Sequence, residues 1–176
     1  MTSPLTVRDS RDDDLPSITA IYGYHVRHGL ASFEEEAPPL EEMAKRRAGY
    51  LAAGYPYIVA EAEGHVLGYA YVSAYRPRPA YRFAVENSVY IDQDARRGGI
   101  GSALLPVLIG RCVALGYRQM IAVIGDSANA ASIGLHAKFG FREIGVIRSI
   151  GFKHGRWVDS VLMQRALGDG DGTMPR

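Results

Sequence analysis

The chain has 176 residues and a mass of 19.2 kDa, the size of one domain, and 47% of it is hydrophobic, enough for a sizeable core. Twenty Lys and Arg against 19 Asp and Glu leave a net charge of +1, which argues against nucleic acid or a membrane surface as partner. The lone cysteine, Cys112, cannot form an internal disulfide, so a cytoplasmic location is expected.

The first half of the chain predicts a strand, two helices and a hairpin, because the hydrophobic period alternates between about 3.6 and two residues. In chain order we expect a strand at 5–8, a helix capped by Asp13 or Asp14, a helix at 40–51, and strands at 57–60 and 66–72. The dipeptide Glu63-Gly64 is a hairpin signal, so the last two strands should pair antiparallel.

The second half predicts two strand–helix units and two closing strands. In chain order we expect a strand at 83–92, a helix after the glycines at 98–101, a strand at 119–124, a helix at 129–138, and strands near 144–147 and 157–164. Pro106 should kink its helix or lie near the helix start. We expect one α/β domain over residues 4–166, with one mixed sheet and helices on both of its faces, and a frayed tail at 167–176.

The most informative stretch is a basic, glycine-rich turn between a strand and a helix, Arg96-Arg97-Gly98-Gly99-Ile100-Gly101-Ser102. Glycines allow the main chain to approach a phosphate, and the N–H groups of a helix start stabilise its charge. A P-loop is excluded, because Ser102-Ala103 follows the last glycine where Lys and then Ser or Thr are needed. The dinucleotide fingerprint is weak, because Leu104 stands at its third glycine position.

Arg96, Gly99 and Gly101 do meet the pattern Arg-x-x-Gly-x-Gly, and a second segment runs from Asn129 to Phe141. In this order and separation the two segments resemble those of the GNAT superfamily of acyl-coenzyme A N-acyltransferases. Five further stretches resemble its phosphinothricin and methionine sulfoximine acetyltransferase branch: Ile21-Tyr22, Ser32-Phe33-Glu34, Tyr75-Arg76-Pro77, residues 85–91 and residues 155–159. The resemblance implies a GNAT fold, in which a mostly antiparallel, twisted central sheet is flanked by helices on both faces. It also implies transfer of acetyl from acetyl-coenzyme A to the α-amine of small amino-acid analogues, and a homodimer.

The resemblance also implies that acetyl-coenzyme A is held mainly by main chain. The strand at 89–91 would bond the pantetheine arm, the amides of 97–102 would hold the pyrophosphate, and the Ile91 amide would face the developing oxyanion. Asn129 would bond the pantetheine or cysteamine end, or serve only as a helix cap. The implied cofactor-binding residues are Val89, Tyr90, Ile91, Arg96, Arg97, Gly98, Gly99, Ile100, Gly101, Ser102 and Asn129.

Two side chains are candidates for proton transfer, since an α-amine is largely protonated near neutral pH. Glu86 precedes the cofactor strand where the branch has a Glu beside the acceptor, and it would receive the amine proton. His136 stands where many members of the superfamily have Tyr, and it could protonate the leaving thiolate or relay a proton through water. Strand alternation puts Glu86 and Ser88 on one face and Asn87 and Val89 on the other.

For the acceptor, an arginine is expected, because a guanidinium matches a carboxylate with two hydrogen bonds. Arg76 is the first candidate, and the nearby tyrosines either wall the pocket or pack in the core. Residues 34–36 are expected to be an exposed acidic run. The implied substrate-binding residues are Phe33, Tyr75, Arg76, Pro77, Arg78, Glu86, Asn87 and Ser88.

Other chemistry has less support. The apolar stripe predicted for the helix after the glycine turn consists of Leu104, Val107, Leu108, Cys112 and Leu115. Because Cys112 lies on this stripe, direct transfer in a ternary complex is favoured over a covalent acyl-enzyme. His25 and His28 have no third ligand nearby, so no metal is expected. Two alternatives stay open: acetylation of another amine, such as a peptide N-terminus, a lysine or a polyamine, and a non-catalytic acyl-coenzyme A-binding module.

Overall fold

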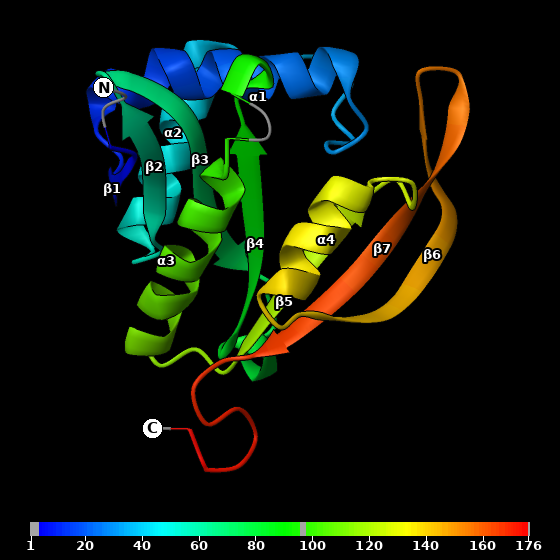
Figure 1. The fold of residues 1–176 in the computed structure, drawn as a ribbon. Coiled ribbons are helices and arrows are strands. Elements are labelled where there is room, and N and C mark those ends of the chain that lie inside the picture. The colour runs from blue at the N-terminus through cyan, green and yellow to red at the C-terminus, as the bar shows by residue number, and fades with distance from the viewer. Residues whose placement is uncertain (1–3, 96–97, 176) are drawn as a thin grey trace.

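A computed structural model describes residues 4–95 and 98–175, which form a seven-stranded sheet with helices on both faces (Figure 1). The strand order is β1-β2-β3-β4-β5-β7-β6. Neighbouring strands pair antiparallel, except that β4 and β5 pair parallel at the centre of the sheet. This is the mixed, mostly antiparallel sheet that the sequence predicts.

The expected elements are present, with shifts at their ends. The strands are β1 (Thr6–Asp9), β2 (Tyr57–Ala62), β3 (His65–Ala74), β4 (Ala84–Ile91), β5 (Gln119–Gly125), β6 (Arg142–Lys153) and β7 (Arg156–Ala166). The helices are α1 (Leu15–His28), α2 (Leu40–Ala52), α3 (Ile100–Ala114) and α4 (Ala130–Lys138), with 3-10 turns η1 (Asp12–Asp14), η2 (Pro79–Tyr81) and η3 (Gln93–Ala95). The last two strands are longer than predicted, because register shifts in β6 interrupt the alternation that signals a strand.

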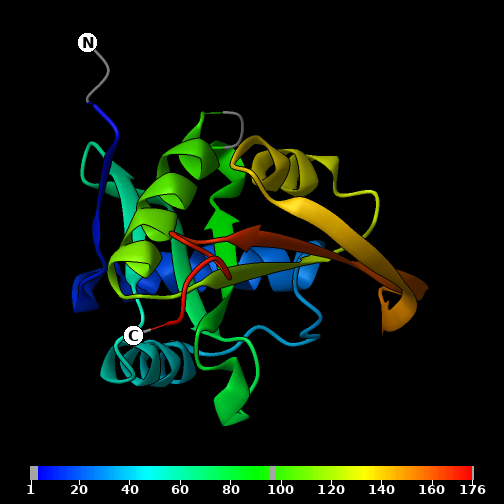
Figure 2. The ribbon, with the colours of Figure 1, turned by 90° about the horizontal axis from the view of Figure 1, so that it is seen from below.

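Strand alternation divides the interior into two layers. On one face, α3 and α4 cover apolar side chains of β2 to β5, with Leu104 and Leu108 fully buried. On the other face, α1 and α2 cover stacked tyrosines, among them Tyr57 and Tyr69. Figure 2 shows the two helix pairs on opposite sides of the sheet. Burial of each large apolar side chain contributes roughly 1.5–3 kcal/mol, so both layers hold β4 in place.

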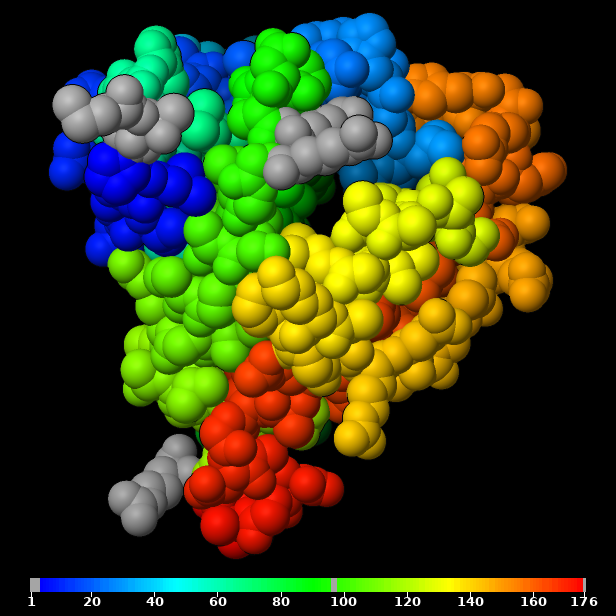
Figure 3. Space-filling view, viewed as in Figure 1, coloured from blue at the N-terminus to red at the C-terminus, as the bar shows by residue number. Residues whose placement is uncertain are grey.

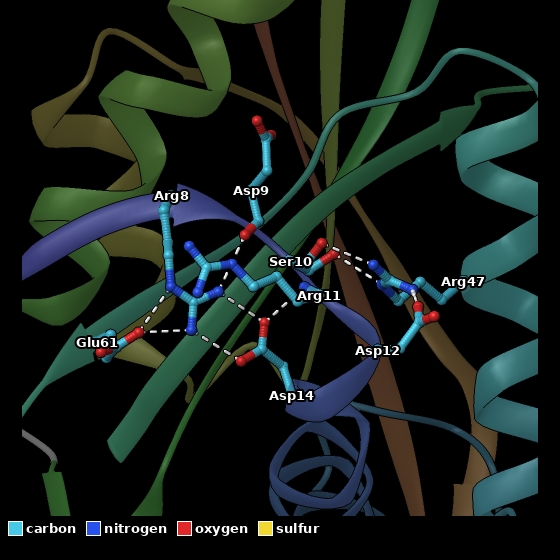
Figure 4. Close-up of polar contacts among 8 residues, drawn as sticks. All are labelled: Arg8, Asp9, Ser10, Arg11, Asp12, Asp14, Arg47 and Glu61. Atoms are coloured by element: carbon cyan, nitrogen blue, oxygen red, sulfur yellow. Dashed lines mark hydrogen bonds and ion pairs between the residues drawn. The ribbon is translucent and has the colours of Figure 1, made fainter. Parts of the chain in front are cut away.

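Ion pairs connect β1 to its neighbours (Figure 4). Arg8 donates to both carboxylate oxygens of Asp14 at 2.8 Å and to Glu61 on β2 at 2.6 Å. This guanidinium holds the pKa of Asp14 below its usual range. Asp14 occupies the cap position of α1, as predicted, but its carboxylate bonds Arg8 and the Arg11 amide instead of the helix amides. Arg47 of α2 pairs with Asp12 in the same region.

The apolar stripe of α3 agrees with the prediction except at its end. Leu104, Leu108 and Cys112 are fully buried, and Pro106 lies in the second turn with its side chain exposed. Leu115, predicted to continue the stripe, is 55% exposed. That prediction was wrong because Leu115 is the C-cap residue, where the chain already turns away from the sheet.

The C-terminal segment contacts the fold where fraying was expected. Leu167 is buried, and Arg118 donates hydrogen bonds to the Gly170 carbonyl and the Thr173 hydroxyl. The segment at 167–175, which the structure describes, therefore contacts the domain although its composition is polar. Within the described ranges, no helix combines the length and apolar character that a membrane crossing requires.

Candidate active site

The centre of the sheet opens between β4 and β5. Their parallel pairing ends where Asn87 lies opposite Ala122. Beyond this point β4 continues to Ile91 against β3, whereas β5 continues to Gly125 against β7, so the two strands diverge. A cavity of about 50 Å³ lies in the opening and is lined from both faces of the sheet. The diverging main chains can bond a ligand there instead of each other.

A groove of about 640 Å³ extends from this opening between β4, α1 and α4. Its lining includes the predicted cofactor strand, Val89-Tyr90-Ile91, together with Asn129. Figure 3 shows a hollow between the green surface of β4 and α3 and the yellow surface of α4. His25 of α1 also lines the groove, and its Nε2 donates to the Ile91 carbonyl oxygen at 2.8 Å. This contact fixes the end of β4, and no local pattern in the sequence predicts it, because the two residues lie 66 positions apart.

The glycine turn forms the start of α3. Gly99 is the N-cap residue and has a φ of 75°, a left-handed conformation that glycine adopts without strain. A side chain at Gly101 would lie 2.8 Å from Leu135 of α4, so glycine permits the close approach of the two helices. Gly98 is exposed and Ile100 is buried. The predicted phosphate residues Arg96 and Arg97 lie outside the described residues.

A second cavity of about 310 Å³ adjoins this helix start, and Gly99, Gly101 and Ser102 contribute to its wall. The N–H groups of a helix start and its dipole favour an anion at such a place. Lys138, at the end of α4, lines the same cavity and donates to Ser102 Oγ at 3.2 Å. Sequence reasoning missed Lys138, although it lies within the second segment that carries the resemblance.

Asn129 occupies the N-cap position of α4. Its Oδ1 accepts a hydrogen bond from the Ser132 amide at 3.2 Å, and its Nδ2 lies 3.5 Å from the Gly125 carbonyl oxygen. The side chain also lines both the central opening and the groove. Of its two expected roles, the helix cap is therefore formed, and contact with the cofactor stays a prediction.

His136 lies on α4 with its ring against β4. It is buried, its Nε2 lies 2.9 Å from Asn87 Oδ1, and its Nδ1 lies 2.8 Å from the Ser132 carbonyl oxygen. Burial lowers the pKa of His136, and the hydrogen bond to Ser132 opposes that shift. The side-chain amide of Asn87 points to the α4 face, and its Nδ2 donates to the Ile121 carbonyl oxygen at 3.0 Å. Contact of Asn87 with the acceptor stays a prediction.

Glu86 lies one residue earlier on β4, so its side chain points to the opposite face of the sheet. The strand thus separates Glu86 from His136, and a proton passing between them must cross the opening beyond Asn87. Burial raises the pKa of Glu86, and the positive charge of Arg76 partly offsets this rise. Ser88 shares the face of Glu86, as the strand alternation predicts, and it lines the central opening.

The loop after β3 brings the predicted acceptor residues to the start of β4. The guanidinium of Arg76 lies 5.1 Å from the Tyr75 ring centroid, and Tyr75 packs edge-on against Tyr81. Pro77 and Arg78 are exposed in the same loop. Arg76 is the member of this group whose charge acts on Glu86.

The loop between α1 and α2 carries Phe33 to the other end of the opening. Phe33 is 43% exposed, and its ring lies where side chains on Gly125 or Gly151 would be. A side chain on Gly125 would also lie 2.0 Å from the Leu30 carbonyl oxygen, so this glycine lets the loop cross β5. Lys153 donates to the Ser32 carbonyl oxygen and holds the loop to β6.

Glu34 in this loop departs from the expected exposed acidic run. Its carboxylate accepts from the Tyr22 hydroxyl at 2.9 Å and pairs with Arg46 of α2 at 2.6 Å. Glu35 and Glu36 are exposed, as predicted. The prediction was wrong for Glu34 because its partners come from helices distant in sequence.

The lone cysteine and the residue types that bind metals are the other candidates for chemistry. Cys112 is fully buried, and burial raises the pKa of its thiol to about 12. Across residues 4–95 and 98–175, no three His, Cys, Asp or Glu side chains gather as a metal site.

A mixed sheet that splays at its one parallel pair, beside a helix that starts at a glycine turn, defines an acyl-coenzyme A-dependent N-acetyltransferase. The chain belongs to the GNAT acetyltransferase family, because the family described as "Acetyltransferase (GNAT) domain" matches residues 7–162. The expected family and fold are thereby confirmed.

Similar proteins have been named for their activities. The chain is 59% identical to "Phosphinothricin N-acetyltransferase" of Alcaligenes faecalis over 97% of this chain and 86% of that protein. It is 44% identical to "L-methionine sulfoximine/L-methionine sulfone acetyltransferase" of Pseudomonas paraeruginosa over 92% of this chain and 94% of that protein. The crystal structure of a phosphinothricin acetyltransferase from Sinorhizobium meliloti with acetyl-coenzyme A superposes with a TM-score of 0.95, at 53% identity, covering 98% of this chain and 93% of that one.

Proposed function

We propose that this chain acetylates the α-amine of small amino-acid analogues of the phosphinothricin and methionine sulfoximine or sulfone type, with acetyl-coenzyme A as donor. The observation that carries the proposal is the opening between β4 and β5. It adjoins the groove between β4, α1 and α4, and it is lined by Ser88, which lies on the face of the sheet that bears the carboxyl group of Glu86. The names of relatives at 59% and 44% identity support this choice of acceptors.

The cofactor-side residues suit acetyl-coenzyme A, which supplies an acetyl group activated as a thioester. The N–H groups at the start of α3 offer an anion site for the pyrophosphate, and Lys138 adds a positive charge beside it. The edge of β4 at residues 89–91 offers main-chain partners to the amides of the pantetheine arm. A methyl group at Gly101 would already crowd Leu135, so the room between α3 and α4 at the cavity depends on glycine.

Glu86 is proposed to receive the proton of the acceptor ammonium group. A general base works best when its pKa lies near the working pH, and burial raises the pKa of this carboxyl group above its ordinary value. Its ionised form also attracts the ammonium group into place. His136, across the opening, is proposed to transfer a second proton, either to the leaving thiolate or by relay through water.

Arg76 is proposed to bind the carboxylate of the acceptor. The guanidinium is exposed at the loop beside Glu86, so one acceptor molecule can present its carboxylate to Arg76 and its amine to Glu86. This pairing selects an α-amino acid over a simple amine. Phe33, Tyr75, Pro77, Arg78 and Ser88 remain predicted pocket residues.

Direct transfer in a ternary complex follows from the state of Cys112. The thiolate is the nucleophilic form of cysteine, and a buried thiol with a pKa of about 12 is almost entirely protonated at neutral pH. A covalent acyl-enzyme on this residue is therefore disfavoured. Intersecting double-reciprocal plots are expected, and parallel lines would contradict direct transfer.

An acceptor screen tests the proposal. Purified protein is mixed with acetyl-coenzyme A and, separately, with phosphinothricin, methionine sulfoximine, methionine sulfone, a peptide with a free N-terminus, N-α-acetyllysine and spermidine, and free thiol is measured. The expected result is the highest kcat/KM with one of the first three, and no release with its N-acetylated form. A higher value with the peptide, the lysine or the polyamine would favour another amine acceptor. Thiol release with none of them would favour a non-catalytic binding module.

A homodimer is also proposed. Five large apolar side chains of β6 and β7 are between 43% and 64% exposed: Ile144, Ile147, Ile150, Phe152 and Trp157. A second copy of the chain would remove such a surface from water. Sedimentation equilibrium is expected to give twice the subunit mass, and a single-subunit mass at assay concentration would overturn the proposal.

Two broader expectations belong to the same proposal. We place the enzyme in the cytoplasm, which suits a chain with one buried thiol, and we treat residues 4–166 as one domain. Both helix layers share the same sheet, so they should unfold together. A single calorimetric transition would support one domain, and two separated transitions would contradict it.

A further inference from the structure

The ring of His136 is held between two oxygen atoms. Nδ1 lies 2.8 Å from the carbonyl oxygen of Ser132, and Nε2 lies 2.9 Å from Oδ1 of Asn87. The amide nitrogen of Asn87 donates to the Ile121 carbonyl oxygen at 3.0 Å. These three contacts form a chain from α4 through β4 to β5 that begins and ends at a carbonyl group, which can only accept.

A neutral imidazole leaves this chain one proton short. When the Asn87 amide nitrogen donates to the Ile121 carbonyl oxygen, the single N–H of the neutral ring can donate either to the Ser132 carbonyl oxygen or to Asn87 Oδ1. At the other of these two contacts, a ring nitrogen with a lone pair faces an oxygen acceptor, and no hydrogen lies between them. Turning the amide over moves the unfilled contact to Ile121 without removing it. The Ser132 hydroxyl makes only a long hydrogen bond to Nδ1, at 3.5 Å, and this bond puts no hydrogen on the shorter contact between Nδ1 and the Ser132 carbonyl oxygen. A second proton on His136 fills all three contacts.

The surroundings keep this chain enclosed. His136 is 4% exposed and Asn87 is 6% exposed, and the ring of Phe141 packs edge-on against the imidazole. Burial favours the neutral ring, whereas the chain of acceptors favours the protonated one. The other ionisable side chain that lines the central opening is Tyr90, and burial raises its pKa far above neutrality.

We propose that Asn87 is a positioning residue that keeps a neutral His136 ready to take up one proton as the acceptor nitrogen is acylated. This inference rests on the proposed function. An N–H bond of the acceptor breaks and leaves its electron pair on nitrogen, and the proton bonds to the ring nitrogen that still has its lone pair. His136 then gives this proton to the departing thiolate and returns to the neutral state.

The opening between the strands provides the path. Asn87, Ser88 and His136 all line the cavity of about 50 Å³, and its volume admits water. Ser88 belongs to the face of Glu86, and His136 belongs to the other face. A proton can therefore reach the imidazole through water at the point where the β4 and β5 pairing ends.

Titration of His136 by nuclear magnetic resonance in the free protein tests the inference without the reaction. Asn87→Asp keeps the shape of the side chain and adds a negative charge, so the pKa of His136 should rise by about one to two units. Asn87→Leu keeps a similar shape and removes the acceptor, so the pKa should fall. The expected order is Asp above Asn above Leu.

Gln164→Leu serves as the matched control. Gln164 also carries a side-chain amide in the sheet, and its hydrogen bond is to Gln119 on β5 rather than to His136. The pKa of His136 should stay unchanged in this variant. An unchanged pKa in both Asn87 variants would overturn the inference, and if Asn87→Leu does not fold, an unchanged value in Asn87→Asp alone would do so.

Kinetics separate this inference from the proposed function. Because the ring must be neutral to accept a proton, the acidic limb of kcat should move to higher pH in Asn87→Asp, in step with the measured pKa of His136. If the pKa of His136 responds to the Asn87 variants but the wild-type protein releases no thiol with any acceptor, the influence of Asn87 on His136 stands and the proposed function fails. Active variants whose limb does not follow the His136 pKa would defeat the inference alone.

Discussion

The two faces of the sheet meet at the opening between β4 and β5, and they are built differently. The α3 and α4 face offers a ligand mainly main chain: a helix start at Gly99, a strand edge and a capped helix. The opposite face offers side chains, with Glu86 and Arg76 near the start of β4 and Phe33 on a distant loop. Main-chain contacts suit a co-substrate common to a whole family, whereas side chains can change with the acceptor.

Removing the carboxylate from the side-chain face should have the largest effect. We expect Glu86→Gln to lower kcat/KM by about 10² to 10⁴-fold, the usual contribution of a general base. Steady-state thiol release with saturating acetyl-coenzyme A measures it. Glu143→Gln, an exposed glutamate of β6, is the matched control and should retain wild-type turnover. Equal activity of the two variants would remove Glu86 from the mechanism.

Crowding the main-chain face should come next. Gly101→Val brings side-chain atoms against Leu135 and Ile91, and we expect acetyl-coenzyme A affinity to fall about tenfold or more, with overpacking costing about 1–3 kcal/mol of stability. Gly110 lies in the same helix with open space around it, so Gly110→Ala should raise the free energy of unfolding by up to about 1 kcal/mol through its higher helix propensity. Calorimetric binding and thermal unfolding measure both. Unchanged affinity in Gly101→Val would show that this helix start does not hold the cofactor.

A smaller effect is expected at the acceptor carboxylate. Arg76→Met should raise the KM of the amino-acid acceptor about tenfold, the lower end for a charged hydrogen bond, because the guanidinium is exposed to water. The KM of acetyl-coenzyme A should not change. An acceptor KM equal to that of the wild type would place the carboxylate elsewhere.

The smallest effect concerns pH. Burial raises the pKa of Glu86 above its ordinary value, and the base must be ionised, so kcat/KM should decline as the pH falls through that raised pKa. Arg76 lowers this pKa, so Arg76→Met should move the acidic limb to higher pH. In Glu86→Gln the part of the limb that responds to Arg76 should disappear, and the part set by His136 should remain. A shift to lower pH in Arg76→Met would contradict the assignment.

The sequence predicts the main-chain half of this site well and the side-chain half less completely. The turn at 98–101, the Asn129 cap and the hairpin at Glu63-Gly64 depend on local rules that glycine and capping residues report directly. The lengths of β6 and β7 depend on register shifts that a period of two cannot reveal.

Contacts between distant segments could not be read from local patterns. Glu34 belongs to a run of three acidic residues, yet Tyr22 and Arg46 bind it. Alternation along β4 correctly separates Glu86 from Asn87, but the partner of Asn87 on α4 follows from the packing of that helix. Lys138 and His25 were missed for the same reason, because their contacts to Ser102 and Ile91 span many residues.

The division of labour between the two faces is tested most directly by titrating acetyl-coenzyme A into a variant altered only on the acceptor face, Glu86→Gln with Arg76→Met. We expect a dissociation constant within about twofold of the wild-type value, because groups without shared partners act independently. A loss of acetyl-coenzyme A affinity as large as that in Gly101→Val would contradict the separation of the two faces.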